Sequence, residues 1–120
     1  MKKILLAEDE EVLRMLVLDT LEDEDYDVYE AADGNEAFDL IQQQEFDLLI
    51  LDYMMPGYTG LELIQMVRAG KSNKDAKILM LSAKSQQYEQ EIVKNAGADH
   101  FICKPFSPLQ LLEKIGEILS

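Results

Sequence analysis

Four short apolar runs in this chain each lead into a polar residue whose side chain could act in catalysis or in ligand binding. Continuous apolar runs separated by helix-like stretches are typical of strands buried in a parallel sheet. The carboxyl ends of such strands meet along one edge of the sheet, where functional crevices form. The runs therefore predict a single site. They occupy residues 4–7, 48–51, 78–81 and 101–103, and they lead into Glu8 with Asp9, Asp52, Ser82 and Lys104.

The chain as a whole has the pattern of a strand followed by a helix, repeated five times. Alternating units of this length favour a parallel sheet with right-handed crossovers and helices on both faces. We expect a doubly wound, flavodoxin-like (βα)5 fold of the α/β class with strand order 2-1-3-4-5, forming a single domain over residues 1–120. The expected strands lie near residues 3–7, 26–31, 47–51, 77–82 and 99–103, and the expected helices near 10–23, 34–44, 60–69, 86–96 and 108–119.

Apolar residues at helical spacing predict which face of the first helix is buried. The members of this stripe are Leu13, Leu16, Val17 and Leu21. Met15 and Leu18 are expected on the outward side of the same helix. They are either isolated apolar surface residues, which are common, or part of a docking surface for a kinase helix bundle beside Phe106 and Pro108.

Capping residues place the ends of three other helices. Asp33, followed by Glu36, is typical of a capping box at the start of the second helix. Ser107 before a proline predicts the start of the last helix. Gly97 is expected to end the fourth helix.

Charge and composition narrow the class of function. The net charge is −13, from 24 acidic and 11 basic residues. Direct binding of nucleic acid is not expected, because affinity for phosphate backbones comes from clustered lysine and arginine. No apolar stretch approaches the ~20 residues that a membrane span needs. Cys103 is the only cysteine, and we expect a cytoplasmic location.

Three carboxylates and one cation are expected at the predicted site. Glu8, Asp9 and Asp52 would repel one another, and a hard divalent cation relieves that repulsion. Oxygen-only ligands favour Mg²⁺, with Asp9 and Asp52 as direct ligands and Glu8 acting through a water. Lys104 can reach a phosphoryl oxygen or pair with Asp52, and Ser82 offers a hydroxyl. Asp52, at the centre, becomes the nucleophile that forms an aspartyl phosphate.

Taken singly, each of these residues also has a simpler explanation. The acidic run that begins at Glu8 could be favoured by the dipole at a helix N-terminus. A serine after a strand and a Lys-Pro pair are both common in turns. Their joint placement at four strand ends favours the phosphate site.

At these residues the chain resembles the receiver domains of response regulators in two-component and phosphorelay signalling, the CheY-like superfamily. The match is carried by Glu8-Asp9, by the stretch Asp52-Tyr53-Met54-Met55-Pro56-Gly57-Tyr58-Thr59-Gly60, by Ser82-Ala83 and by Lys104-Pro105-Phe106. The resemblance extends from Lys3 to Leu119.

The resemblance implies a role for each matching residue. Asp52 would accept a phosphoryl group from a phosphohistidine on a sensor histidine kinase or a phosphotransfer protein. Mg²⁺ would be bound by the acidic pair, by Asp52 and by the backbone carbonyl of Met54. Ser82 and Phe101 would be the switch residues, and the peptide bond before Pro105 would be cis. The surface formed by the helix at 86–96, the strand at 99–103 and the helix at 108–119 would then change shape and control a downstream protein or output domain.

Three positions depart from the commoner pattern of that family. Glu8 replaces an aspartate, which lengthens the arm toward the metal. Met54 and Lys84 stand two residues beyond Asp52 and Ser82, at positions that tune loss of the phosphoryl group in the family. A bulky apolar side chain and a cation are poorly suited to orienting an attacking water. We therefore expect a slowly decaying phosphoryl group.

The sequence is compatible with three hypotheses for the function. The first is a phosphorylation-activated switch that acts only on its own aspartate and is not an enzyme in the conventional sense. The second is a Mg²⁺-dependent phosphatase with an aspartate nucleophile, although Met54 stands where a second aspartate would act as general acid. The third is a phosphorylation-independent scaffold with a receiver-like fold. The first hypothesis is favoured because every phosphorylation residue is present.

Overall fold

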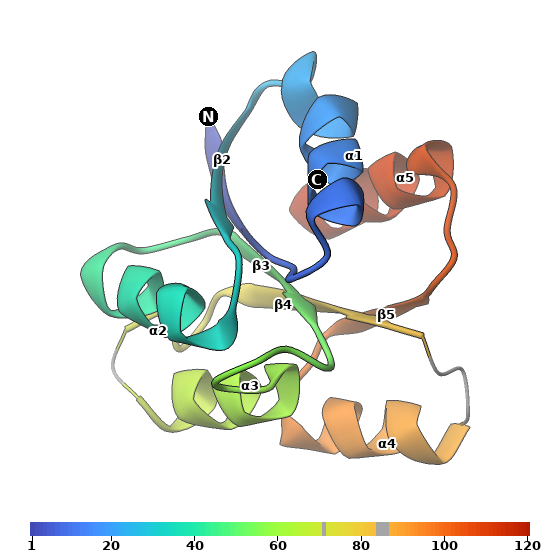
Figure 1. Cartoon of the computed structure of the whole chain (residues 1–120). Coiled ribbons are helices and arrows are strands. Elements are labelled where there is room, and N and C mark those ends of the chain that lie inside the picture. Colours follow the sequence, from blue (N-terminus) through green and yellow to red (C-terminus); the bar gives the residue numbers. More distant parts are fainter. Residues whose placement is uncertain (71, 84–86) are drawn as a thin grey trace.

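The computed structural model describes residues 1–70, 72–83 and 87–120, and in them strands and helices alternate along the chain (Figure 1). The strands are β1 (Lys2–Ala7), β2 (Tyr26–Ala31), β3 (Leu48–Asp52), β4 (Lys77–Ser82) and β5 (His100–Cys103). The helices are α1 (Glu11–Glu22), α2 (Gly34–Gln43), α3 (Gly60–Ala69), α4 (Gln87–Ala96) and α5 (Pro108–Leu119). Each element begins and ends within one residue of its predicted bounds.

The strands form one parallel sheet in the order β2-β1-β3-β4-β5, which confirms the predicted fold. Parallel pairing requires a crossover after each strand, and a helix supplies it here. The register pairs Ala7 with Leu51 and Asp52 with Leu81. The residues that follow β1, β3 and β4 are therefore neighbours along one edge of the sheet.

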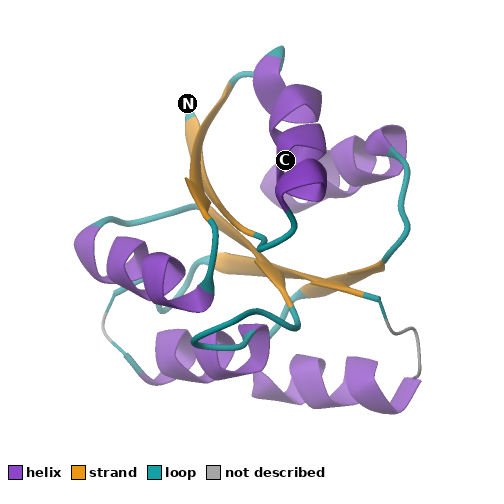
Figure 2. Ribbon diagram, viewed as in Figure 1, coloured by secondary structure: helices purple, strands orange, loops and turns teal. Residues whose placement is uncertain are grey.

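Helices cover both faces of the sheet, so its central strand is buried on both sides. Figure 2 shows α1 and α5 on one side of the strands and α2, α3 and α4 on the other. Side chains of β1 and β3 alternate between the two layers: Leu5 and Leu49 pack with α2, α3 and α4, whereas Ile4 and Leu48 pack with α1 and α5. All five residues of β3 are buried.

The buried face of α1 differs from its prediction at two positions. Val17 and Leu21 are buried and Leu13 packs beside them, as expected. Leu16, however, is 41% exposed, and Leu18 packs against the core. Steps of four residues turn a helix by slightly more than one full turn, so the buried stripe drifts toward Leu18 and away from Leu16.

Side-chain caps hold the first turns of α2, α3 and α5. Asp33 accepts a hydrogen bond from Glu36 N at 2.8 Å, and Ser107 Oγ accepts one from Gln110 N at 3.1 Å. The capping box predicted for α2 is not closed, because the Glu36 carboxylate accepts from Ala32 N. A complete box is found at α3, where Thr59 and Glu62 exchange hydrogen bonds.

The end of α4 matches its prediction. Gly97 follows this helix with φ +125°, a conformation that favours glycine.

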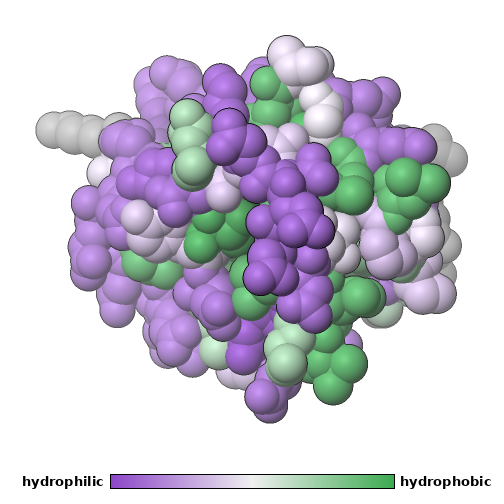
Figure 3. All heavy atoms as spheres, turned by 90° about the horizontal axis from the view of Figure 1, so that it is seen from above, coloured by the Kyte–Doolittle hydropathy of each residue, from purple (hydrophilic) through white to green (hydrophobic). Residues whose placement is uncertain are grey.

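The outer surface is dominated by polar residues. Figure 3 shows one face on which hydrophilic residues predominate and apolar residues gather in separate groups. Within the described residues, no helix combines the length and hydrophobicity needed to cross a bilayer.

Candidate functional site

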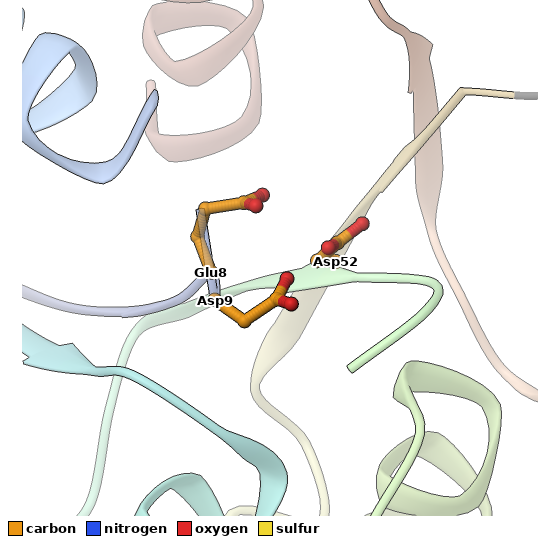
Figure 4. A group of neighbouring side chains, drawn as sticks. All are labelled: Glu8, Asp9 and Asp52. Carbon is orange, nitrogen blue, oxygen red and sulfur yellow. The ribbon is translucent and has the colours of Figure 1, made fainter. Parts of the chain in front are cut away.

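The carboxyl edge of the sheet brings three carboxylates together. Glu8 and Asp9 follow β1, and Asp52 is the last residue of β3. Figure 4 shows the side chains of Asp9 and Asp52 turned toward each other, with Glu8 beside them. One oxygen from each of the three lies within 4.8 Å of the others. Glu8 is fully buried and Asp52 is 5% exposed, whereas Asp9 reaches solvent.

A single ammonium group lies between two of these carboxylates. Lys104 Nζ lies 3.2 Å from Asp52 Oδ1 and 3.0 Å from Glu8 Oε2, and it donates a hydrogen bond to Glu8 Oε1 at 3.3 Å. Pairing with Asp52 was expected from the sequence, but pairing with Glu8 was not. The longer arm of a glutamate brings its carboxylate within reach of Lys104.

Burial and crowding change the proton affinity of two of these groups. Burial raises the pKa of Asp52, and the charge of Glu8 raises it further; Lys104 opposes both, and the pKa reaches about 7. For Lys104, burial is the largest single influence and lowers the pKa. Hydrogen bonding and charge from Glu8 and Asp52 outweigh burial, so the pKa of Lys104 lies above its ordinary value.

Five of the predicted site residues, Asp9, Asp52, Met54, Ser82 and Lys104, line one small pocket of about 170 Å³ at the end of the sheet. Ser82, at the end of β4, is 2% exposed, and Met54 stands at the mouth with 67% of its surface exposed. Lys84, predicted to tune the site with Met54, lies outside the described residues. The pocket is lined by Asp9, Glu10, Asp52, Tyr53, Met54, Ser82, Ala83 and Lys104.

Three described residues of the predicted site, Glu8, Phe101 and Pro105, do not line this pocket. Phe101, in β5, is half-buried and packs against the core on the α2–α3–α4 side of the sheet. It also lines a separate cavity of about 170 Å³ with Val93 and Ala98. The peptide bond between Lys104 and Pro105 is cis, the geometry that the resemblance implied.

Arg14 supports the site and was not predicted from the sequence. Its Nη1 donates a hydrogen bond to the backbone carbonyl of Glu8 at 2.8 Å, and its Nε pairs with Glu30 at 3.3 Å. The loop that carries Glu8 and Asp9 is thereby tied to α1 and to β2. An arginine on an amphipathic helix is too common to signal this contact from the sequence.

The donor set fits Mg²⁺. Three carboxylates face one lysine, which leaves an excess of negative charge in a largely buried place. Glu8 Oε2 is buried, and it forms an ion pair with Lys104 Nζ at 3.0 Å but accepts no hydrogen bond of good geometry from the described residues. Oxygen ligands of this charge, without histidine or cysteine among them, suit a hard divalent cation.

Comparisons with known proteins agree with this geometry. A family model described as the response regulator receiver domain matches residues 4–116. The chemotaxis response regulator CheY4 of Vibrio cholerae is 37% identical, with a TM-score of 0.93 and 99% of each chain covered. The response regulator TrrA of Thermotoga maritima, solved in complex with Mg(2+)-BeF, is 39% identical, with a TM-score of 0.86, and the match covers 99% of this chain and 100% of that chain.

A third similar structure is the receiver domain of a sensor histidine kinase from Pseudomonas aeruginosa, which has a magnesium ion coordinated in its active-site cleft. It is 26% identical, with a TM-score of 0.88, and the match covers 98% of this chain and 97% of that chain.

Proposed function

Because this chain belongs to the response regulator receiver family, whose members are signalling switches, we propose that it is a switch controlled by phosphorylation of Asp52. The observation that carries the proposal is the convergence of Asp52, two further carboxylates and Lys104 at the end of the sheet, where Asp9, Asp52 and Lys104 line one pocket. Residues 1–120 form one such domain in this proposal, and its location is cytoplasmic.

Asp9 and Asp52 would hold Mg²⁺ directly, together with the backbone carbonyl of Met54, and Glu8 would act through a water. When bound, Mg²⁺ neutralises the crowded carboxylates and the charge on the oxygens of a phosphoryl group. Asp52 lies at the centre of these groups and is 5% exposed, so only a small opening leads to its carboxylate.

In the transfer step, a carboxylate oxygen of Asp52 attacks the phosphorus of a phosphohistidine. The new O–P bond forms as the N–P bond breaks, and the imidazole leaves with the electron pair of the broken bond. Lys104 already lies 3.2 Å from Asp52 and turns from Glu8 toward the transferred oxygens. Ser82, at the end of the neighbouring strand, donates its hydroxyl to another of them. The protein acts on its own side chain and turns over no external substrate.

The new charge then moves the switch residues. A phosphoryl group adds about −1.5 to −2 charges and draws Ser82 and Lys104 toward Asp52. Phe101 is half-buried beside a cavity, so it has a space to enter and leave. Its movement alters the surface formed by α4, β5 and α5, and this surface controls a downstream protein or output domain.

The phosphoryl donor would dock beside the pocket. A groove of about 440 Å³ adjoins it, with Leu13 and Leu16 on one side and Pro105 and Phe106 on the other. Met15, which is 54% exposed, extends the apolar surface of α1 next to this groove. An apolar surface of this kind suits a helix bundle of a sensor histidine kinase or a phosphotransfer protein. Leu16 takes the place in this surface that the sequence assigned to Leu18.

The proposal is tested by intact mass after incubation with acetyl phosphate and Mg²⁺. We expect a gain of one phosphoryl group that is lost in Asp52→Asn and in EDTA. No gain in the wild-type chain with Mg²⁺ bound would overturn the switch and favour a scaffold. The docking surface is tested separately with Leu16→Glu. This variant should slow transfer from a phosphohistidine protein but leave transfer from acetyl phosphate unchanged.

A further inference from the structure

The loop that follows Asp52 rests on the first turn of α2, although the two are distant in sequence. We propose that Gly34 in this turn is a positioning residue for the Mg²⁺ site, because it fixes the backbone of the loop that carries the Met54 carbonyl. This inference rests on the proposed function and adds to it a residue that contacts neither metal nor phosphate.

Both ends of the loop are tied to the sheet. Tyr53 N donates to Leu81 O at 2.8 Å, and Gly60 N donates to Tyr53 O at 3.1 Å. A Cβ on Gly60 would overlap the Asp52 carbonyl oxygen, so α3 begins directly against the end of β3. Between these ends, residues 54–59 leave the sheet, and their position depends on what they touch outside it.

Gly34 provides that contact through its own backbone. Its N–H donates a hydrogen bond to Pro56 O at 2.9 Å. A Cβ at this position would overlap the carbonyl oxygen of Tyr58 and lie 2.5 Å from Tyr58 N. Backbone therefore packs on backbone at a distance that any side chain would prevent. Because the obstacle is backbone, an alanine here could be accommodated only if the loop or the helix moved.

Neighbours of Gly34 hold the same loop from two further sides. Gly57 has φ +77°, and a Cβ on it would lie 2.9 Å from the Asn35 side chain. The rings of Phe38 and Tyr58 are 5.1 Å apart between centroids. The first turn and a half of α2 thus meets the loop at three successive residues, 56, 57 and 58.

A backbone carbonyl has no rotamers with which to correct a displacement, unlike the carboxylates of Asp9 and Asp52. The position of the Met54 carbonyl therefore follows the loop backbone, and the loop backbone follows α2. Groups that orient metal ligands without touching the metal commonly change affinity by about 10-fold to 100-fold when altered. The geometry places Gly34 in that class.

Gly34→Ala tests the inference against Gly116→Ala, a matched control. Gly116 also lies in a helix, but a Cβ there would meet no atom within 4 Å. Isothermal titration of the metal-free chain with Mg²⁺ should give about tenfold weaker binding for Gly34→Ala and unchanged binding for Gly116→Ala. Unfolding by urea in EDTA reports whether each variant is folded, independently of the metal.

If Gly34→Ala does not fold, Phe38→Leu takes its place, because it removes the ring contact with Tyr58 without a backbone collision. It should weaken Mg²⁺ binding while the chain remains folded in EDTA. Wild-type affinity in folded Gly34→Ala, or in Phe38→Leu where the first does not fold, would overturn the inference and leave the proposed function standing. A wild-type chain that binds no Mg²⁺ would overturn both.

Discussion

Two clusters of charged residues lie at opposite ends of the sheet and differ in how well their charges are balanced. At the amino-terminal end, Arg68 makes five hydrogen bonds, one for each N–H of its guanidinium: to Gly97 O twice, to Lys74 O, to Ala76 O and to Asp99. At the carboxyl end, the carboxylates of Glu8 and Asp52 both pair with one ammonium group, that of Lys104, and Asp9 is a third carboxylate beside them.

This difference in charge balance indicates different roles: the Arg68 cluster stabilises the fold, and the Asp52 cluster is suited to bind a cation. The Arg68 cluster joins the end of α3 to the loops before β4 and β5, and every donor is used. The Asp52 cluster has an excess of negative charge where water is excluded. Such an arrangement costs stability and is retained at sites where a ligand completes it. Removing a charge should therefore have opposite effects at the two ends.

The largest effect is expected at Arg68. Arg68→Ala removes five hydrogen bonds at once and leaves the half-buried or buried carbonyls of Gly97 and Ala76 without this donor, so the free energy of unfolding should fall by about 3 kcal/mol. Urea unfolding measures this loss, and the loss should be the same in EDTA and in Mg²⁺. Lys114→Ala, which removes a 3.8 Å pair with Glu117 on the surface of α5, is the control and should change little. A loss that depended on Mg²⁺ would mean that the two ends are coupled.

Asp52→Asn should act in the opposite direction. The pKa of Asp52 is raised from 3.8 to about 7, so the native chain holds this proton more tightly than the unfolded chain does. Native stability is therefore lost as the pH rises from about 4 through about 7. Asparagine does not titrate. In metal-free buffer the variant should be more stable than wild type at pH 8, by an amount on the order of a few kcal/mol, and the difference should disappear below pH 4.

The check is urea unfolding of both chains in EDTA between pH 4 and pH 8. Saturating Mg²⁺ should remove the advantage of Asp52→Asn at pH 8. The cation binds the native state and not the unfolded state, and the native wild-type chain, which keeps the Asp52 carboxylate, binds it more tightly than the variant and is stabilised more. Equal stability at pH 8 in EDTA would show that Lys104 already compensates both carboxylates.

A smaller effect is expected from Met54→Asn, which acts on the lifetime of the phosphoryl group. Met54 is exposed at the mouth of the pocket and offers no polar atom to an attacking water. An asparagine supplies a donor and an acceptor at that position, so decay should become severalfold faster. Phosphorylated protein is followed by intact mass over time, with Met15→Asn as an exposed control on α1. An unchanged lifetime would mean that Met54 does not limit decay.

Hydrophobic patterning was sufficient to predict the fold, because four of the five strands carry an apolar run and each is followed by a helix; β2, at the edge of the sheet, contains Asp27 and Glu30 and was predicted from its place in the alternation of strands and helices. The site could be predicted as far as it depends on strand ends: Asp9, Asp52, Met54, Ser82 and Lys104 line one pocket. Beyond the pairing of Lys104 with Asp52, contacts between side chains from different elements could not be predicted. The pairing of Glu8 with Lys104 and the support from Arg14 depend on distances that only the packed structure defines. The contact of Gly34 with the loop after Asp52 depends on backbone approach, which leaves no pattern in one sequence.

The smallest effect is expected from Asp99→Asn, the same substitution as at Asp52 but in the balanced cluster. Asp99 Oδ2 accepts from Arg68 and from Ile78 N, both at 2.9 Å, and an asparagine oxygen can keep both hydrogen bonds. Only the charge is lost, at a side chain that is 32% exposed, so stability should fall by about 0.5 kcal/mol, and by less at high salt. Urea unfolding of Asp99→Asn and Asp52→Asn in one metal-free buffer at pH 8 compares the two ends directly. The two changes in stability should have opposite signs. The Asp99 carboxylate has a full set of hydrogen-bond partners, whereas the Asp52 carboxylate shares Lys104 with the buried carboxylate of Glu8. If both variants were destabilised, the Asp52 carboxylate would be stabilised by its surroundings after all, and its excess charge would no longer explain why this end of the sheet binds a cation.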